Sequence, residues 1–325
     1  MVLVNHNGVR HLEACLETLR PEAAAVAAEV VVVDNASTDA SLELLRRQAG
    51  WLRLVTSTAN LGFAAANNLA IRESASPYLV LLNPDTRVRP GALGALLAAA
   101  EGDRRAAAVS AKLLFAERPT VIQNAGLLLL SDGSGADRGS GEVDAGQYDT
   151  AEEVFGACGA GMLLRRAALA DAGLFDERFF MYYEDLDLSW RFRLRGWRVL
   201  YEPRAVIEHV HAAASGEWSE LFTFLVDRNR LFAIVKNAAP VLVATSFASL
   251  FGRAAANAAG AAGRRPAPAP NRGAARARVH GRVLASFAAQ LPAMLAERRR
   301  VRSRRRVSDR EIRRWMYPRA EWDAR

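Results

Sequence analysis

The first 110 residues alternate short apolar runs with segments of helical periodicity, and no other feature of the sequence constrains the fold as strongly. Each run is followed by a helical segment, the first marked by Leu12, Leu16 and Leu19 and the others starting near residues 41, 64 and 91. Strands that alternate with helices are typical of βαβ units. We therefore predict an α/β fold with a mostly parallel central sheet, whose first four strands cover 1–5, 29–35, 51–57 and 77–83.

Charge divides the chain into two parts. The net charge is +8, but the segment from Arg253 to the end holds 19 Arg and five acidic residues, or +14, which leaves −6 for the preceding 252 residues. The second part also contains two apolar stretches, 237–252 and 283–295. We predict a first domain over 1–215 and a helical, Arg-rich region over 216–325.

Neither apolar stretch reaches the roughly 20 residues that a membrane-spanning helix needs. Each is long enough to lie in the membrane interface with Arg at its edges, and core helices of a small bundle explain them equally well. Two cysteines, Cys15 and Cys158, exclude a disulfide framework, and no Cys/His spacing resembles a zinc site. The N-terminus lacks the pattern of a signal peptide, so we expect a cytoplasmic protein.

Polar residues follow three of the predicted strands. Asn5 ends the first, Asp34 ends the second, and Asn83 and Asp85 end the fourth. A single polar strand end is a turn signal, but ligands of open α/β sheets bind where several carboxyl ends meet. Asp34 is a candidate for a base or ribose contact, and Asp85 for a divalent cation.

A glycine loop for nucleotide phosphates fits the sequence poorly. GACGAG at 156–161 lacks the spacing of the dinucleotide fingerprint, and no Walker lysine is present. The segment NLGFAAANN offers Asn60, Gly62 and Asn67 near a helix start. It suits close backbone approach to a ligand or, equally, a tight turn.

The stretch FFMYYEDLDLSWRFRLRGW at 179–197 places Glu184, Asp185 and Asp187 directly behind bulky aromatic residues. Acidic side chains in a first helical turn complement the helix dipole, which is one interpretation. The other is a catalytic carboxylate with a neighbour that tunes its pKa. The apolar stripe that follows is consistent with a buried helix face in both cases.

Two histidines in AVIEHVH, His209 and His211, lie on one face of a predicted extended segment. A lone histidine is usually structural. Beside a candidate metal carboxylate, however, one imidazole together with oxygen ligands suits Mn²⁺ or Mg²⁺.

Four motifs in this order resemble family-2 glycosyltransferases, most closely the rhamnosyltransferase-like branch, over about residues 1–236. They are VVVDNASTDAS, NLGFAAANNLAI, LLNPDTRV and GLFDERFFMYYEDLDLSWRFRLRGWRVLYEPRAVIEHVH. The resemblance implies a GT-A fold for the catalytic domain 1–215, a nucleotide-sugar donor, a divalent cation, Mn²⁺ or Mg²⁺, and inversion at the anomeric carbon.

The resemblance also implies roles for single residues. Asp185 would be the general base, with Glu184 raising the proton affinity of the pair, and Asp85 and His209 would bind the metal, with His211 a weaker candidate. Asn83 stands where many relatives have an Asp, so direct metal contact rests on Asp85. The nucleotide-sugar-binding residues would be Asn5, Asp34, Asn60, Gly62, Asn67, Asn83 and Asp85.

The implied function is metal-dependent transfer of a hexose, with dTDP-L-rhamnose favoured as donor, to a glycan or lipid-linked saccharide in cell-envelope polysaccharide synthesis. The basic region would hold the enzyme on the anionic inner face of the cell membrane. One alternative is a sugar nucleotidyltransferase, although HNGVRH is a poor version of its N-terminal loop. A nucleic-acid-binding protein is a further alternative, but the tail lacks interleaved aromatics before Trp315 and the body is acidic.

Overall fold

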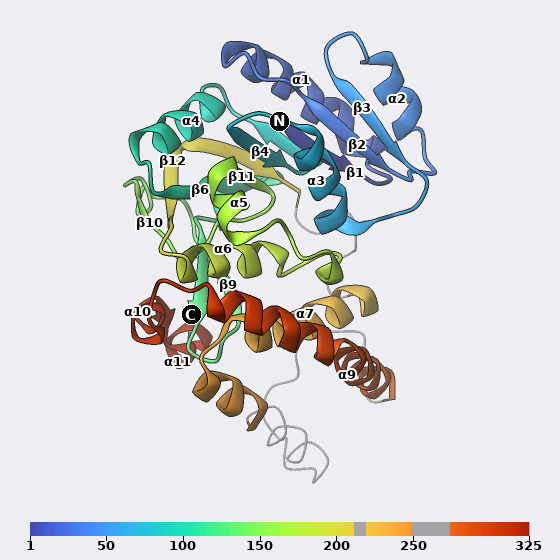
Figure 1. Ribbon diagram of the computed structural model, residues 1–325. Helices are drawn as coiled ribbons and strands as arrows, with labels where there is room; N and C mark the ends of the chain where they lie inside the picture. The colour runs from blue at the N-terminus through green and yellow to red at the C-terminus, as the bar shows by residue number, and fades with distance from the viewer. Residues whose placement is uncertain (211–218, 249–273, 325) are drawn as a thin grey trace.

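The structure is a computed structural model that describes residues 1–210, 219–248 and 274–324. A mixed β-sheet, to which ten strands of these residues belong, carries helices on both faces (Figure 1). The first four strands lie where the sequence predicts them and run parallel in the order β3-β2-β1-β4. They are β1 Val2–Asn5, β2 Val31–Asn35, β3 Arg53–Ser57 and β4 Tyr78–Leu82.

Alternating side chains of these strands enter two apolar layers. Leu3 and Val32 belong to one layer, and Val2 and Val31 to the layer on the opposite face. The two-residue period of a strand produces this alternation, and burial on both faces is usual for parallel strands under helices. The first layer is closed by α1 Val9–Ala25, α2 Ser41–Arg47 and α4 Ala92–Gly102, and the second by α3 Gly62–Glu73, α5 Arg166–Ala172 and α6 Glu184–Leu194.

The prediction of a mostly parallel sheet holds for the first four strands and for the pair β6–β12, but not for the whole sheet. Strand β11 runs antiparallel to both of its neighbours, β4 and β6. An apolar run predicts that a strand is buried but not the direction in which the strand runs. The short connection between β6 and β7 also forces these two strands to pair antiparallel. The remaining strands of the sheet are β5 Thr86–Val88, β6 Ala106–Phe115, β7 Arg118–Asn124, β10 Glu152–Glu153, β11 Gly161–Arg165 and β12 Arg198–His209.

Residues 131–150 are rich in Gly, Ser and Asp, and they contain a strand and many turns. Strand β9 Gly135–Asp137 pairs antiparallel with β8 Leu127–Leu130. Further on, the Lys112 ammonium donates to Asp144 and Asp149 and fastens the segment to β6. The Gly and Asp content therefore reflects turns within an ordered part of the fold.

The C-terminal region is helical, as predicted, and α6 lies between it and the sheet (Figure 1). Trp190 of α6 shares an apolar cluster with Ile234, and Phe179 shares another with Phe232 and Phe287. The parts 1–215 and 216–325 are thus in contact, and the boundary between them remains a prediction. The elements are α7 Glu220–Asn237, a helix over 240–248, α9 Ala274–Ser303, α10 Asp309–Arg313, β13 Met316–Tyr317, which pairs with β8, and α11 Arg319–Asp323.

The two apolar stretches of this region belong to helices packed on one another, except where 249–252 lie outside the described residues. Across the described ranges, no helix combines the length and apolar character that a membrane crossing requires.

Candidate active site

Asp85 and Asp185, exactly one hundred positions apart, line the same cavity, which has a volume of about 310 Å³. Asp85 follows β4, and Asp185 is the second residue of α6. Residues of β7, β9 and α7 complete the wall, among them Gln123, Asp137 and Phe222. Two acidic residues from separate motifs therefore face one space.

One wall of the cavity carries an imidazole beside a carboxylate. His209 Nε2 lies 3.3 Å from Asp85 Oδ1 and 3.1 Å from Asn83 Nδ2. His209 Nδ1 lies 2.7 Å from Gln123 Oε1, which is an acceptor, so the hydrogen-bond network assigns the ring proton to Nδ1. Nε2 then accepts from Asn83 and turns a lone pair toward the cavity wall that holds Asp85.

This wall fits a divalent cation. Asp85 Oδ1 is buried without a hydrogen-bond partner and faces the unprotonated Nε2 of His209, so two electron-rich atoms lie side by side. Carboxylate and neutral imidazole are ligands for Mn²⁺, and the hydrogen bond from Nδ1 is the usual means of fixing the tautomer. Nowhere in the described ranges do three or more His, Cys, Asp or Glu residues gather in a way that could hold a metal ion.

The lining of the same cavity also includes the acidic pair of α6, Glu184 and Asp185. The amide of Gly159 donates to Asp185 Oδ2 at 3.0 Å, and that of Leu186 donates to Oδ1 at 2.8 Å. Burial raises the pKa of Asp185 to about 6, although the two amide hydrogen bonds by themselves would lower it. Burial and the charge of Asp185 raise the pKa of Glu184 well above its usual value, and Glu184 Oε2 has no hydrogen-bond partner. Of the two carboxyls, Glu184 therefore holds its proton more tightly, and the two amide hydrogen bonds favour the charge on Asp185.

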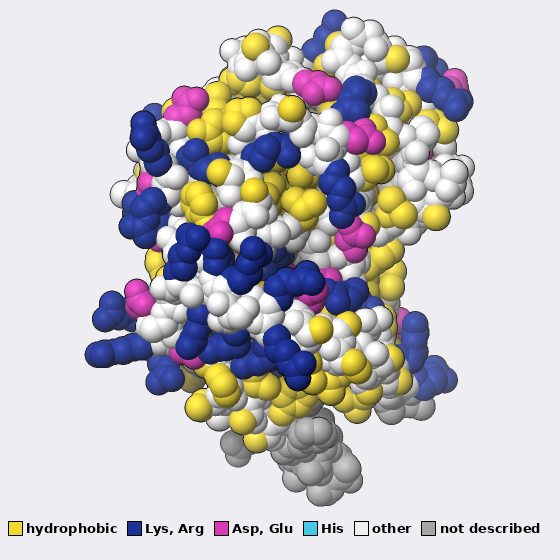
Figure 2. All heavy atoms as spheres, viewed as in Figure 1, with side chains coloured by type: hydrophobic (Ala, Val, Ile, Leu, Met, Phe, Trp, Pro, Cys, Tyr) yellow, Lys and Arg dark blue, Asp and Glu magenta, His cyan; other side chains and the backbone are white. Residues whose placement is uncertain are grey.

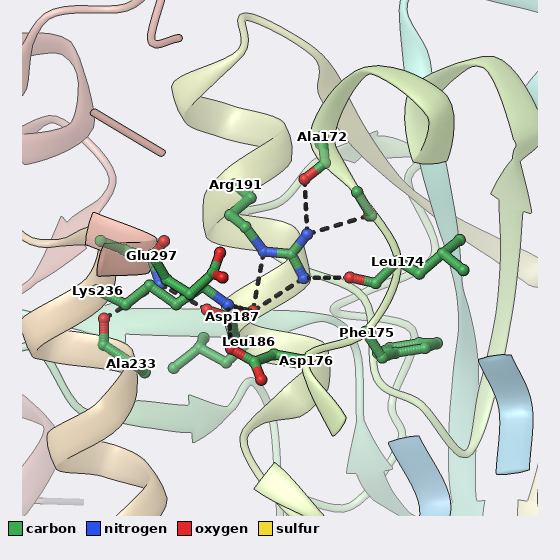
Figure 3. A network of polar contacts seen from close by, with 12 residues as sticks. Ala172, Leu174, Phe175, Asp176, Leu186, Asp187, Arg191, Ala233, Lys236 and Glu297 are labelled. Atoms are coloured by element: carbon green, nitrogen blue, oxygen red, sulfur yellow. Dashed lines mark hydrogen bonds and ion pairs between the residues drawn. The ribbon is translucent and has the colours of Figure 1, made fainter. Parts of the chain in front are cut away.

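The third carboxylate of the motif has a different role. Asp187 is fully buried and accepts from Lys236 and Arg191 at 2.9 Å each and from Asn237 at 2.8 Å (Figure 3). It does not line the cavity. Asp187 thus has a structural role in a buried ion-pair network, whereas Glu184 and Asp185 face the cavity.

Backbone geometry just before α6 turns the acidic pair into the cavity. Phe180, Tyr182 and Tyr183 have φ of 66°, 71° and 68°, which L residues adopt rarely. Gly62 (φ 77°) packs against this segment, and a Cβ there would lie 2.5 Å from the Phe180 ring. The close approach predicted for Gly62 is therefore made to Phe180. Such strained conformations concentrate at functional sites.

Of the predicted nucleotide-sugar-binding residues, Asn83 and Asp85 line this cavity and the other five do not. Asn5 donates to Asp34 at 3.3 Å where β1 and β2 end. Asn60 Oδ1 accepts from the amide of Gly62 at 2.9 Å, and Asn67 donates to Phe63 O within its own helix at 2.9 Å. Asn5 and Asp34 thus meet at the strand ends, whereas Asn67 is turned toward its own backbone.

Some lining residues carry no signal in the sequence. Gln123 comes from an edge hairpin, and Phe222 and Val226 come from α7, so only the tertiary structure brings them to the acidic pair. Asn124 donates to Asp137 at 2.6 Å in the same wall. His211, the weaker metal candidate, lies outside the described residues.

The fold is that of GT-A glycosyltransferases. A mannosyltransferase from Pyrobaculum calidifontis, solved with GDP-Man and Mn²⁺, has a TM-score of 0.54 at 18% identity and covers 92% of this chain and 83% of its own. Residues 1–349 of Staphylococcus aureus TarS, solved with UDP, have a TM-score of 0.53 at 15% identity over 97% of this chain and 91% of that chain.

Residues 1–173 match the profile of Glycosyl transferase family 2, and the chain belongs to this family. It is 28% identical over 264 residues to the N-acetylglucosaminyl-diphospho-decaprenol L-rhamnosyltransferase of Mycobacterium tuberculosis, covering 70% of this chain and 84% of that protein. It is 26% identical over 180 residues to the poly-beta-1,6-N-acetyl-D-glucosamine synthase of Staphylococcus aureus, covering 55% of this chain and 42% of that one. The resemblance to a rhamnosyltransferase-like glycosyltransferase is confirmed.

The raised pKa of Asp185 predicts a pH-dependent stability. Because its folded-state pKa of about 6 exceeds the 3.8 of an unperturbed Asp, ionisation of Asp185 destabilises the folded state as the pH rises through this window. We expect Asp185→Asn to melt about 2 °C above the wild type at pH 8 and level with it at pH 4. Thermal unfolding followed by circular dichroism checks this. A variant that is less stable at pH 8 contradicts the burial argument.

Proposed function

We propose that this glycosyltransferase is metal-dependent and inverting, and transfers L-rhamnose from dTDP-L-rhamnose to a hydroxyl of a lipid-linked saccharide during cell-envelope polysaccharide synthesis. The observation that carries the proposal is that Asp85, His209 and Asp185 line one cavity. The choice of L-rhamnose and of the acceptor rests on the mycobacterial relative, whose name specifies L-rhamnosyl transfer to a lipid-linked sugar. The choice of dTDP rests on the resemblance to the rhamnosyltransferase-like branch.

In this proposal Asp185 removes the proton of the acceptor hydroxyl. A sugar hydroxyl is a poor nucleophile, and a positioned base of suitable pKa accelerates such a step by about 10²–10⁴. Asp185 is ionised above pH 6, and its amide hydrogen bonds fix the carboxylate in place. We place the donor between Asp185 on one side and Asp85 and His209 on the other, so that attack comes from the face opposite the leaving group and inverts the anomeric carbon.

Asp85 and His209 would hold the cation at the donor diphosphate. A bound divalent cation neutralises charge that develops on the leaving nucleoside diphosphate. Gln123 keeps His209 in the tautomer that can ligate a metal, and Asn83, which donates to the single lone pair of Nε2, would have to turn away when a cation binds there. We assign the nucleoside contact to the pair Asn5–Asp34 at the neighbouring strand ends, with Asn60, Gly62 and Asn67 shaping the adjoining helix start.

We further propose that the domain 216–325 holds the enzyme at the cytoplasmic face of the membrane. Lys and Arg side chains gather over the C-terminal helices, with apolar side chains below them (Figure 2). Leu284 and Leu295 of α9 are 48% and 44% exposed. Cationic side chains beside exposed leucines suit an anionic lipid surface, where each Arg contributes about 1 kcal/mol.

The assignment of the base predicts opposite outcomes for two neighbouring substitutions. Asp185→Asn should lower kcat about 10²–10⁴-fold, because the amide cannot accept the proton. Glu184→Gln should keep most of the turnover, because Glu184 is the member of the pair whose pKa is raised further and is not the proposed base. Release of dTDP from dTDP-L-rhamnose by purified, Mn²⁺-loaded protein measures both, and wild-type turnover in Asp185→Asn rejects the assignment.

The assignment of the metal site predicts how nucleotide binding depends on Mn²⁺. Calorimetry should show that the wild type binds dTDP more tightly with Mn²⁺ than without it, whereas Asp85→Ala should bind it equally in both conditions. Asp103→Ala is a matched control, because Asp103 pairs with Arg198 and does not line the cavity. A Mn²⁺ effect that persists in Asp85→Ala contradicts the assignment.

The membrane proposal predicts flotation with anionic lipid. Intact protein should float with vesicles of phosphatidylglycerol and less with phosphatidylcholine, and Leu284→Ser with Leu295→Ser should reduce the flotation. Flotation that depends on neither the lipid charge nor the two leucines argues against a membrane role for α9.

A further inference from the structure

Helix α7 contacts the base-bearing segment, residues 176–187, in its middle. Asn229 is fully buried, and its Nδ2 lies 2.8 Å from Phe179 O, 2.8 Å from Met181 O and 2.7 Å from Tyr182 O. Its Oδ1 accepts from Arg228 Nε at 2.9 Å, which fixes the orientation of the amide. The amide has two N–H groups for these three carbonyls, so at least one N–H is shared between two of them.

The same helix holds both ends of the segment. The buried Lys236 ammonium donates to Asp176 at 2.8 Å and to Asp187 at 2.9 Å (Figure 3). Asn237 donates to the other oxygen of Asp187 at 2.8 Å. The start of the segment and the first turn of α6 are therefore fixed to one turn of α7.

The segment needs such contacts because its backbone is strained. It contains no glycine, yet Phe180, Tyr182 and Tyr183 all have positive φ. Strained residues of this kind persist only when their surroundings hold them. On the other side the amide of Ala64 donates to Phe180 O at 3.1 Å, so the segment lies between α3 and α7.

We propose that Asn229 is a positioning residue for Asp185, and that α7 is thereby part of the active site. The hydrogen bonds of Asn229 end at Tyr182, and Glu184 and Asp185 follow two and three residues later. Helix α7 lies beyond the part of the chain that matches the family profile, residues 1–173, and also lines the cavity with Phe222 and Val226. The proposal rests on the assignment of Asp185 as the general base.

Asn229→Ala tests the proposal by separating kcat from KM. Without the amide, the three carbonyls lose their shared donor and the acidic pair moves. We expect kcat to fall about 10²-fold, as displacement of a catalytic group by about 1 Å can cause, and KM for dTDP-L-rhamnose to stay within about two-fold of wild type, since Asp85 and His209 are untouched. Hydrogen–deuterium exchange should become faster in peptides covering 179–186 and little changed in the central sheet.

Arg298→Ala is the matched control. Arg298 donates to Val235 O at 2.7 Å and to Ala238 O at 2.8 Å, so its loss also weakens the hold on α7 but leaves the segment's own contacts in place. We expect this variant to keep kcat and the wild-type exchange of 179–186. If Asn229→Ala does not fold, Asn229→Ser, which keeps one donor, should show the same changes at smaller size.

The outcomes are distinguishable. The proposal is overturned if the folded Asn229 variant keeps wild-type kcat. It is also overturned if hydrogen–deuterium exchange in peptides covering 179–186 changes no more in the Asn229 variant than it does in Arg298→Ala. A wild-type protein that lacks transferase turnover would instead contradict the proposed function. Exchange in the resting protein would still show whether Asn229 holds the segment, because that measurement needs no substrate.

Discussion

The arrangement of the active site depends on a buried ammonium group. Lys236 lies between the carboxylates of Asp176 and Asp187, and all three side chains are almost without solvent exposure (Figure 3). Removing one partner from such a buried group typically costs about 3–5 kcal/mol, because the remaining charges lose their compensation. The pKa of Asp176 is accordingly far below its usual value. Burial alone would raise this pKa, but the charges of Lys236 and Arg178 and their hydrogen bonds to Asp176 outweigh that effect. The contact joins α7 to the first turn of α6, from which the acidic pair projects.

The three acidic residues of α6 show how one helical turn serves two purposes. Residues two positions apart point in different directions around a helix, so Asp187 enters the ion-pair network while Asp185 faces the cavity. Glu184 and Asp185 share a poorly solvated wall in which both cannot ionise freely, and the amides of Gly159 and Leu186 favour the charge on Asp185. The folded state is destabilised by this charge, and the pKa of the proposed base is raised to about 6.

Much of the fold and part of the candidate site could be predicted from the sequence, and the features that could not be predicted have physical reasons. The first four strands and the helices between them follow from local periodicity, and the place of Asp85 and Asp185 in one cavity agrees with the roles that the family resemblance implies. The antiparallel β11 does not, because an apolar run has no direction. The contacts of Gln123 with His209 and of Asn229 with Phe179 span 86 and 50 residues, and neither residue stands in a recognisable motif. The sequence likewise does not show which of Glu184, Asp185 and Asp187 enters the ion-pair network and which face the cavity, because their contacts come from other parts of the chain.

The central claim is that a cation-binding wall and a basic carboxylate face one another across a single cavity. Anomalous scattering from Mn²⁺ in crystals of the protein grown with dTDP tests it most directly. The account predicts one strong peak in contact with both Asp85 Oδ1 and His209 Nε2, with the nucleotide diphosphate on the side of the ion that faces Asp185. A peak elsewhere, or a diphosphate bound outside this cavity, would contradict it.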